Sequence, residues 1–384
     1  MRFEFSTARQ IIFGNGSINQ LIPLISNICE HVLIATGSSI DRAKPVSDQL
    51  NEKDIPNTIF QVPGEPTTQL VLEGIKLARS KKCDLVIGIG GGSVIDAGKV
   101  IAALLTNTGE LFDYLEVIGK GRNISIQPAP YIAIPTTAGT GAEVTRNAVL
   151  GSTEHKVKVS MRSHLMLPYI TIVDPELTLS MPPAVTASTG LDALTQLVEV
   201  YVSNKANPMT DGICFEGIKR AGRSLLTAYR QGDNRLARED MSLASLFSGM
   251  ALANAKLGAV HGFAAPLGGM YSASHGVICA ILLPQVIEEN VNALTNKDPE
   301  APALKRYDHI AQILTGENKA TAKDAVIWIK NICGELKIPK LNKFGCKEKD
   351  IPAIITKAKN ASSMQGNPVK LTDSELTRIL IKAM

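Results

Sequence analysis

The stretch CDLVIGIGGGSVIDAGK, residues 83–99, decides how the first half of the chain is expected to fold. Its first eight residues are mostly apolar and end in glycine, as in a strand that is buried on both faces. The spacing of apolar residues after it predicts a helix that runs to about Leu105. Three consecutive glycines let the backbone approach an anion closely, and a helix N-terminus supplies free N–H donors. The stretch therefore favours a phosphate-binding turn between a strand and a helix.

Two known phosphate-binding fingerprints match this turn only in part. Ser93 takes the place of the last glycine in the dinucleotide motif GxGxxG, and no GKS or GKT follows, as it would in a P-loop. The alternative interpretation is a tight structural turn, with Ser93 near the N-cap and Asp96 three residues later, as in a capping box. The loop by itself leaves both interpretations open.

The rest of the first half repeats this alternation of strand and helix. Four more short apolar runs, each ended by Gly, Pro or Thr, have the look of buried strands: residues 31–37, 57–63, 131–137 and 169–175. Helical patterns such as residues 67–82 lie between them, which predicts a parallel sheet covered on both faces. From about Thr178 the strand-like runs fade and helical periodicity takes over. We therefore predict an α/β domain over residues 1–178 and an all-helical domain over residues 179–384.

Two further loops at predicted strand ends suit a nucleotide. IPTTAGTGAEVTRN, residues 134–147, places hydroxyl groups and bare backbone after a strand, where a ribose or phosphate could bind. In ATGSSIDR, the strand ends in Gly37, Ser38 and Ser39, without the acid that would hold the ribose of NAD. These residues and the nearby Arg42 would tolerate the 2′-phosphate of NADP. NADP is therefore expected to bind at least as well as NAD.

Composition limits the class of protein. The chain has 384 residues, of which 45% are hydrophobic and 20% charged, as in ordinary globular proteins of about two domains. Its formal charge is +4 without a long basic block, so nucleic acid is not an expected partner. No two of the six cysteines form a CxxC pair, the N-terminus lacks a signal-peptide pattern, and no apolar run reaches membrane-spanning length. We expect a reduced, cytoplasmic protein with no membrane partner.

The helical half carries a few polar residues that would suit a metal. In TGLDALTQLVE, residues 189–199, Asp192 and Gln196 are four residues apart and share one face of an apolar helix. His261 and His275 are separated by glycines and a proline, which argue against one continuous helix between them. Neutral imidazole and carboxylate suit a divalent first-row metal. Taken singly, each histidine is more often structural, so the residues alone leave the metal site open.

At this point the chain resembles the iron-containing, or group III, alcohol dehydrogenases along nearly its whole length. The resemblance is carried, in order, by IIFGNGSI, GGGSVIDAGK, IPTTAGTGAE, VDPELTLSMPP, TGLDAL, YVSNKANPMTD, LGAVHG and SHGVICAILLP. It implies an α/β nucleotide-binding domain, a helical metal-bearing domain and a cleft between them. It also implies reversible reduction of aldehydes or ketones with NAD or NADP.

The resemblance also implies roles for individual residues. The pyrophosphate of the cofactor would contact Gly91, Gly92 and Ser93, and Asp96 would help to hold the nicotinamide half. Further cofactor contacts are implied for Thr136, Thr137, Thr140 and Lys158. A divalent metal, Fe²⁺ or Zn²⁺, would be held by Asp192, Gln196, His261 and His275. Of these, Asp192, His261 and His275 would also be the catalytic residues.

Two departures from the family pattern bear on the metal. Gln196 stands where the family has a histidine ligand, and Ala265 stands where many members carry a histidine that is a candidate proton relay. An amide oxygen is a weaker and harder ligand than imidazole, so the affinity for Fe²⁺ or Zn²⁺ should fall and Mg²⁺ or Mn²⁺ becomes a candidate. Some relatives, the maleylacetate reductases, work without a bound metal.

These features together predict hydride transfer between nicotinamide C4 and a small primary alcohol or aldehyde. The carbonyl would be polarised by the metal, or by a protonated His261 or His275 if no metal is bound. Three alternatives stay open: a metal-independent reductase of a keto or enoyl acid, with Arg146 and Arg162 as candidate anion contacts; a lyase resembling dehydroquinate synthase; and a nucleotide-binding protein with a decayed active site. A homodimer is expected, in which N-terminal strands near Phe3–Phe13 pair across subunits.

Overall fold

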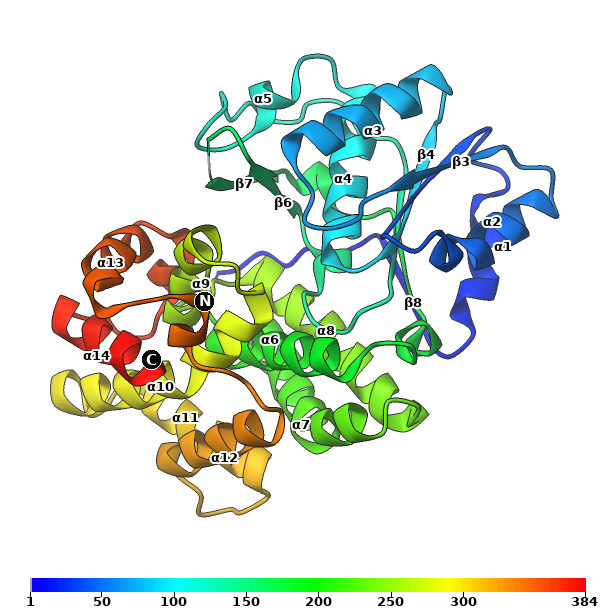
Figure 1. Cartoon of the computed structure of the whole chain (residues 1–384). Coiled ribbons are helices and arrows are strands. Elements are labelled where there is room, and N and C mark those ends of the chain that lie inside the picture. The colour runs from blue at the N-terminus through cyan, green and yellow to red at the C-terminus, as the bar shows by residue number, and fades with distance from the viewer. Residues whose placement is uncertain (1, 156) are drawn as a thin grey trace. The chain divides into compact units, whose positions relative to one another are not determined.

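The computed structural model describes residues 2–155 and 157–384, which form two compact units (Figure 1). The α/β unit comprises Ser6–Thr137 and Gly141–Thr178. The helical unit comprises Leu179–Met384 together with residues 2–5 and 138–140. The predicted fold class, a parallel sheet followed by an all-helical part, is confirmed. Residues 138–140 differ from the predicted division because Gly139 packs directly against Thr189 of the helical unit.

The sheet of the α/β unit has six strands in the order β1-β8-β5-β4-β2-β3, and every neighbouring pair is parallel. The strands are β1 (Gln10–Phe13), β2 (Val32–Thr36), β3 (Asn57–Gln61), β4 (Leu85–Gly90), β5 (Tyr131–Pro135) and β8 (Ile170–Val173). Each predicted run therefore contains one strand, shortened by one or two residues at its ends. An antiparallel pair, β6 (Asn147–Ser152) and β7 (Val157–Arg162), was not predicted.

The N-terminal strand differs from its prediction. Only Gln10–Phe13 of the expected range Phe3–Phe13 is a strand, and it pairs with β8 of the same chain. This pairing places β1 at an edge of the sheet. An edge strand retains free N–H and C=O groups along one side, so the expected pairing across a dimer stays a prediction.

The sheet is buried on both faces, as the continuous apolar runs predicted. Along β2, Val32 and Ile34 point into one hydrophobic core, whereas Leu33 and Ala35 point into another. Helices α1 and α2 cover the first face, and α3 and α4 cover the second. The helices of this unit are α1 (Leu21–Ile25), α2 (Lys44–Asn51), α3 (Thr68–Ser80), α4 (Gly92–Thr106) and α5 (Leu111–Tyr114).

Helix α4 lies unusually close to the sheet because two glycines make room for one tyrosine. A Cβ atom on Gly88 of β4 would lie 2.2 Å from the Tyr131 hydroxyl, and one on Gly98 of α4 would lie 2.7 Å from the Tyr131 ring. The Tyr131 hydroxyl donates a hydrogen bond to the carbonyl of Ile95 in α4, at 2.9 Å. The tyrosine thereby joins β5 to α4 and fixes the start of α4 at the carboxyl end of β4.

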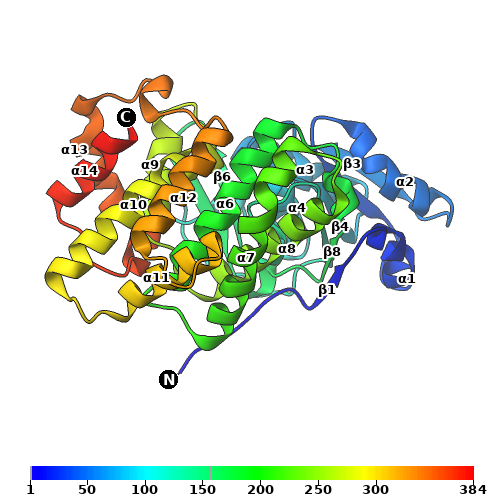
Figure 2. The same ribbon diagram turned by 90° about the horizontal axis from the view of Figure 1, so that it is seen from below.

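The helical unit is organised around α6, which packs against α7, α8 and α10 (Figure 2). Its helices are α6 (Pro183–Val202), α7 (Pro208–Arg230), α8 (Arg235–Asn254), α9 (Ala259–Met270), α10 (His275–Lys297), α11 (Pro302–Thr315), α12 (Ala322–Glu335), α13 (Ile351–Lys359) and α14 (Asp373–Ala383). Because α6 has neighbours on several sides, Asp192 and Gln196 are buried within the unit instead of facing water.

One helix, α10, is long and apolar enough to cross a membrane when judged by length and composition alone, and the bent pair α8 and α9 would add a second if counted as one span. In α10, 72% of the apolar window is buried inside the protein. A core helix of a soluble protein has this character, since its apolar surface is covered by other helices. The hydropathy of α10 therefore reflects its place in the core of the helical unit.

Candidate metal and cofactor sites

The start of α10 is held against α6 by a glycine. A Cβ atom on Gly276 would lie 2.2 Å from the carbonyl oxygen of Ser188 and 3.3 Å from Cβ of Asp192. No side chain fits at this position, so the first turn of α10 touches α6 where Asp192 projects. Pro266 lies inside α9, and the break between the two histidines falls instead at residues 271–274, between α9 and α10. His261 and His275 each lie in the first turn of a helix.

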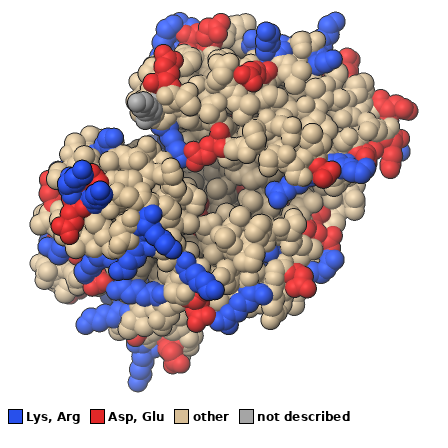
Figure 3. Space-filling model, in the orientation of Figure 1, with Lys and Arg blue, Asp and Glu red and all other residues tan. Residues whose placement is uncertain are grey.

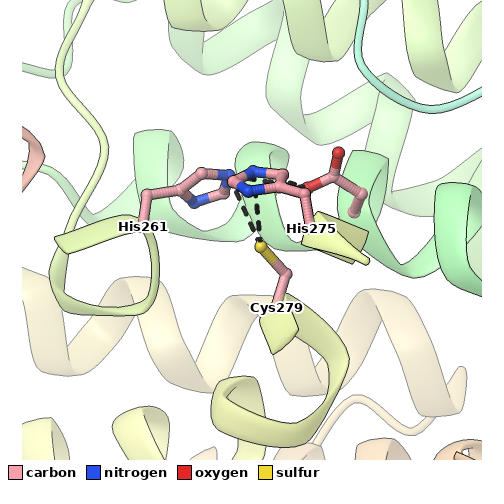
Figure 4. Close-up of side chains that lie close together, drawn as sticks. His261, His275 and Cys279 are labelled. Atoms are coloured by element: carbon pink, nitrogen blue, oxygen red, sulfur yellow. Dashed lines mark hydrogen bonds and ion pairs between the residues drawn. The ribbon is translucent and has the colours of Figure 1, made fainter. Parts of the chain in front are cut away.

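The structure brings Asp192, His261 and His275 together, as the sequence predicted. Oδ1 of Asp192 lies 3.5 Å from Nε2 of His261 and 3.7 Å from Nε2 of His275. Asp192 and His261 are buried, whereas the His275 side chain is 44% exposed. Figure 4 shows the two imidazoles pointing toward each other and toward Cys279. These atoms come from three helices, α6, α9 and α10, and converge on one point.

Cys279 is the residue that the sequence interpretation missed. Its Sγ lies 3.7 Å from Nε2 of His275 and 3.8 Å from Nε2 of His261. The donor atoms of Asp192, His261, His275 and Cys279 all lie within 4.8 Å of one another. The signal was present in SHGVICA, where His275 and Cys279 are four residues apart and so share one face of a helix. The spacing of the cysteines from one another does not reveal this pair.

The predicted ligand Gln196 is buried one turn after Asp192 on α6. Its Oε1 atom has no hydrogen-bond partner among the residues that the structure describes. An unpartnered buried amide oxygen is unfavourable and suits either a cation or an ordered water molecule. The predicted effect of glutamine at this position, a lower affinity for Fe²⁺ or Zn²⁺, stays a prediction. Ala265 lies on α9, one turn after His261, and is exposed.

Glu199 forms a second layer behind His261. Its Oε2 accepts a hydrogen bond from His261 Nδ1 at 2.6 Å, and its Oε1 accepts one from the backbone N–H of Val260 at 2.6 Å. The carboxylate fixes the imidazole with Nδ1 protonated, which leaves Nε2 facing Asp192. Gly258 makes this approach feasible, because a Cβ there would lie 2.9 Å from Glu199 Oε1. A carboxylate behind a histidine is the usual support of a metal-binding imidazole.

The electrostatics of the cluster favour an ionised Asp192. Burial raises the pKa of Asp192, but His275 and His261 outweigh this and hold it below its usual value. Burial disfavours the imidazolium of His261, yet Cys279, Asp192 and Glu199 raise its pKa well above the usual value. The sulfur of Cys279 is the main cause that raises the pKa of His275 to about 8. The site therefore requires positive charge, from imidazolium or from a cation.

The donor set fits a divalent transition metal. With bonds of about 2.0–2.3 Å and tetrahedral angles, two ligand atoms of one Zn²⁺ lie about 3.3–3.8 Å apart. The separations of Asp192 Oδ1 and Cys279 Sγ from the two Nε2 atoms, 3.5–3.8 Å, are close to this. Asp192 Oδ1 also has no hydrogen-bond partner among the described residues. A buried carboxylate oxygen without a hydrogen bond is energetically unfavourable, and a bound cation would compensate for the missing hydrogen bond.

The predicted cofactor loops follow three adjacent strands of the α/β unit. Ser38 and Ser39 follow β2, Gly91 follows β4, and Thr136 and Thr137 follow β5. The chain order reverses between β2 and β4, because β3 lies beyond β2 on one side whereas β5 lies beyond β4 on the other. In open α/β sheets, ligands bind at the carboxyl ends of strands at such a switch point.

The structure brings two of these loops into contact. A Cβ atom on Gly91 would lie 3.4 Å from the Thr137 side chain, an ordinary contact distance, so the two loops are neighbours. Gly91 is the N-cap of α4, and the first N–H groups of a helix have no partner within the helix. Thr136 Oγ1 is buried without a hydrogen-bond partner among the described residues. Helix dipole, free N–H groups and a hydroxyl without a hydrogen bond would therefore suit an anion here.

Other predicted cofactor residues have different surroundings. Gly37 is followed by the exposed Ser38 and Ser39, with open space beside Gly37. Ser93 lies in the first turn of α4, next to Gly92, and the predicted capping box is wrong: Gly91 is the N-cap, and no side chain caps it.

Three more predicted cofactor residues are held by contacts of their own. Asp96 Oδ2 accepts a hydrogen bond from the Val149 N–H at 2.9 Å. Lys158, on β7, forms an ion pair with Glu65 at 2.6 Å. Thr140 belongs to the segment that packs with the helical unit. The two arginines considered as anion contacts are also engaged: Arg146 contacts the His164 ring, and Arg162 lies 3.5 Å from Glu116.

A buried polar cluster lies beneath the cofactor loops. Lys99 Nζ on α4 donates hydrogen bonds to Thr145 Oγ1 at 2.8 Å and to the Asn147 carbonyl at 2.9 Å. Burial lowers the pKa of Lys99 to about 8 and raises the pKa of Glu143 to about 7. Burial also raises the pKa of Asp96 to about 6. Ionised Glu143 is therefore a source of pH-dependent instability in this unit.

We expect Glu143→Gln to become more stable, relative to the unchanged chain, as the pH rises from 5 to 8. The pKa of Glu143 is 4.5 in the unfolded chain and about 7 in the folded one. The folded state therefore binds this proton more tightly, and the stability gained below pH 4.5 is lost as the pH rises through 7, to an extent of about 3 kcal/mol. Thermal unfolding across this pH range measures the difference. Glu52→Gln, at an exposed position, is the control. A difference independent of pH contradicts the prediction.

Basic and acidic side chains lie close together on the surface of the part of the chain that the structure describes. On the face drawn in Figure 3, Lys and Arg side chains gather over the lower part of the view, with acidic and uncharged side chains among them. Several basic residues are paired with acids, including Arg220 and Arg223 with Asp240 and Arg306 with Asp211. Binding to phosphate backbones requires a basic patch or stripe. The expectation from composition that nucleic acid is not a partner stays a prediction.

A parallel sheet with glycine-rich and threonine-rich loops at its switch point, and a helical unit with a cluster of metal-type donor atoms, are the features expected of a nucleotide-dependent metalloenzyme. Comparison with known proteins makes this more specific. The model of the family "iron-containing alcohol dehydrogenase" matches residues 8–175, and that of its C-terminal part matches residues 186–384. The chain belongs to the iron-containing alcohol dehydrogenase family.

Individual relatives agree with this assignment. Alcohol dehydrogenase 4 of Saccharomyces cerevisiae is 34% identical over 377 residues, which cover 97% of this chain and 96% of the relative. The crystal structure of a 1,3-propanediol oxidoreductase has a TM-score of 0.91 and 34% identity, with 100% of both chains covered. Sulfoacetaldehyde reductase from Bifidobacterium kashiwanohense, in complex with NAD⁺, has a TM-score of 0.89 and 25% identity, with 100% of this chain and 99% of that chain covered. The predicted activity class, an oxidoreductase acting on CH–OH groups, is confirmed.

Proposed function

We propose that this alcohol dehydrogenase interconverts a small primary alcohol and its aldehyde, with NAD(P) bound by the α/β unit and a divalent metal bound by the helical unit. The observation that carries the proposal is the cluster of Asp192, His261, His275 and Cys279, whose donor atoms have the separations of ligands around one cation. In the oxidation direction, an alcohol and NAD(P)⁺ give an aldehyde, NAD(P)H and one proton.

The cofactor and the cation would supply the chemistry itself: when bound, NAD(P)⁺ would be the hydride acceptor, and a divalent cation would be the Lewis acid for the substrate oxygen. The protein contributes binding and orientation. Ionised Asp192 supplies negative charge, and Glu199 holds His261 with Nε2 toward the site. The side chain of Ala265 neither donates nor accepts a proton, so the proton would have to leave by a route that does not use this position.

The α/β unit would bind the cofactor through the loops after β2, β4 and β5. The pyrophosphate would lie at Gly91, Gly92 and Ser93, where the start of α4 favours an anion. Directly after β2, Gly37 and the exposed Ser38 and Ser39 carry no carboxylate that would repel a 2′-phosphate, and the first acid of this segment is Asp41. We therefore propose that NADP is accepted at least as well as NAD.

The test is oxidation of NADH and NADPH with a series of small aldehydes, before and after removal of metal by a chelator. We expect aldehyde-dependent oxidation that is lost on chelation and restored by Zn²⁺ or Fe²⁺. Turnover that chelation leaves unchanged would favour a metal-independent reductase. The absence of turnover with every aldehyde and both cofactors, with or without added metal, would refute the proposal.

Glu199 is a positioning residue in this proposal, and its replacement should weaken the metal site without unfolding the protein. We expect Glu199→Gln to raise the dissociation constant for Zn²⁺ by about 10- to 100-fold, the usual effect of losing an outer-shell partner. The amide keeps the size of the side chain but holds the His261 ring less firmly. Calorimetric metal titration measures the change, and the melting temperature without metal tests folding. The control is Glu335→Gln, which removes a surface ion pair with Arg230.

An unchanged Zn²⁺ affinity in Glu199→Gln would show that the carboxylate does not support the metal ligand. A fall in melting temperature without metal, with the affinity kept, would assign Glu199 a purely structural role through its bond to Val260.

A further inference from the structure

Cys279 occupies a position relative to the two imidazoles that is similar to that of the Asp192 carboxylate. Its sulfur is 3.7 Å and 3.8 Å from the Nε2 atoms of His275 and His261. Oδ1 of Asp192 is 3.7 Å and 3.5 Å from the same two atoms. These distances are long for hydrogen bonds between such groups but suit atoms that share a cation. With a Zn–S bond of about 2.3 Å and a Zn–N bond of about 2.0–2.1 Å, a tetrahedral site places sulfur and nitrogen about 3.6 Å apart.

The helical framework holds this sulfur in place before any metal binds. His275 and Cys279 lie one turn apart on α10, so both side chains project from the same face of one rigid element. Gly276 holds that face against α6, next to Asp192. Cys279 is buried, and Figure 4 shows its thiol pointing at both imidazoles. A buried cysteine is more often a small apolar residue that fills space in the core. A residue in that role would have apolar neighbours, whereas Cys279 lies beside two histidines and a carboxylate oxygen that has no hydrogen bond.

A sulfur ligand would compensate for the weaker ligand at position 196. Where the family pattern has an imidazole, this chain has the amide of Gln196, which is a harder and weaker ligand. A thiolate is a soft, charged ligand that favours Zn²⁺ and iron. A site of one sulfur, two nitrogens and one carboxylate oxygen would therefore restore the affinity for Zn²⁺ or iron that is lost when glutamine replaces histidine. With a sulfur ligand, the site would favour Zn²⁺ or iron, although Gln196 alone makes Mg²⁺ or Mn²⁺ a candidate.

We propose that Cys279, as a thiolate, is the fourth protein ligand of the metal held by Asp192, His261 and His275. The inference rests on the proposed function for the presence of a metal. When the cation binds, the S–H bond of Cys279 breaks, its proton passes to water and a sulfur–metal bond forms. No group is oxidised or reduced in this step.

The test is a spectroscopic titration of the chelator-treated full-length protein with Co²⁺ alone. A thiolate bound to Co²⁺ gives a charge-transfer absorption in the near ultraviolet that nitrogen and oxygen ligands do not give. We expect this band to grow to one Co²⁺ per chain in the unchanged protein. It should disappear in Cys279→Ser, whose Zn²⁺ dissociation constant should rise by at least about 100-fold, the upper end of the outer-shell effect.

Matched controls separate this effect from damage to the fold. Cys333→Ser replaces a half-buried cysteine of the same unit that donates to the Ala280 carbonyl, and the band should persist in it. Gln196→Ala should also keep the band. If Cys279→Ser does not fold, the spectrum of the unchanged protein still decides the question.

Stoichiometric Co²⁺ binding without the charge-transfer band would overturn the inference and leave the proposed function intact. A band that survives in Cys279→Ser, or is lost in Cys333→Ser instead, would also overturn it. Failure to bind Co²⁺ at all would overturn it together with the metal role. Aldehyde-dependent oxidation of NAD(P)H would then show whether the protein is a dehydrogenase that works without a metal.

Discussion

Asp192→Asn is expected to lower kcat/KM for aldehyde reduction by at least about 1000-fold, since the loss of an outer-shell partner alone costs about 10- to 100-fold. Asp192 supplies the buried carboxylate of the cluster, and its Oδ1 lies within 3.7 Å of both imidazoles. The amide keeps the volume but removes the negative charge that balances a divalent cation. A 1000-fold loss corresponds to about 4 kcal/mol of transition-state stabilisation.

The cause can be separated from a folding defect by measuring metal content and melting temperature on the same sample. Asp192→Asn should contain little metal after dialysis, while the metal-free protein stays folded and melts at an equal or somewhat lower temperature, because the ion pairs of Asp192 with His261 and His275 are lost. Asp373→Asn removes an equal charge at an exposed position paired with Lys359 and serves as the control. Full activity of Asp192→Asn at normal metal content would exclude Asp192 from the site.

Ser93→Asp should raise the dissociation constant for NADH and NADPH by about 100-fold or more. The new carboxylate would stand in the first turn of α4, where we place the pyrophosphate. Two unit charges about 4 Å apart repel each other by about 4 kcal/mol near a protein surface. Acidic residues stabilise the first turn of a helix, so the fold should not suffer. The variant therefore separates loss of anion binding from loss of structure.

Fluorescence titration with each reduced cofactor measures this effect. Gln69→Glu is the matched control, because it adds the same charge to the first turn of α3, at an exposed position in the same unit. We expect the control to bind both cofactors normally. Unchanged binding in Ser93→Asp would place the pyrophosphate somewhere other than the start of α4.

The sheet was predictable because its strands are buried on both faces and leave an unbroken apolar signal. The β6–β7 pair escaped prediction because it lacks that signal: Val149 and Val157 face outward, and polar residues interrupt both strands. The predicted capping box at Ser93 was wrong because spacing cannot tell which residue has the N-cap conformation. In the structure, that residue is Gly91, with an extended backbone.

The site was predicted in part. Asp192 and both histidines could be chosen because family motifs surround them. Cys279 could not be chosen in this way, because a single cysteine in an apolar helix has the sequence pattern of a core residue. Only the packing of α10 on α6, with Gly276 at the contact, shows that its sulfur faces the imidazoles. The role of Glu199 is similar, since the contact with His261 joins residues 62 positions apart in the chain.

The sequence by itself determined the fold class, the family and the loops that would carry the cofactor. These depend on local patterns, namely apolar periodicity, glycine-rich turns and collinear motifs, which can be read without knowing what lies across the core. The tertiary structure alone decided which donor atoms meet. Coordination depends on separations of a few ångströms between atoms on α6, α9 and α10, and only the packing of these helices sets those distances.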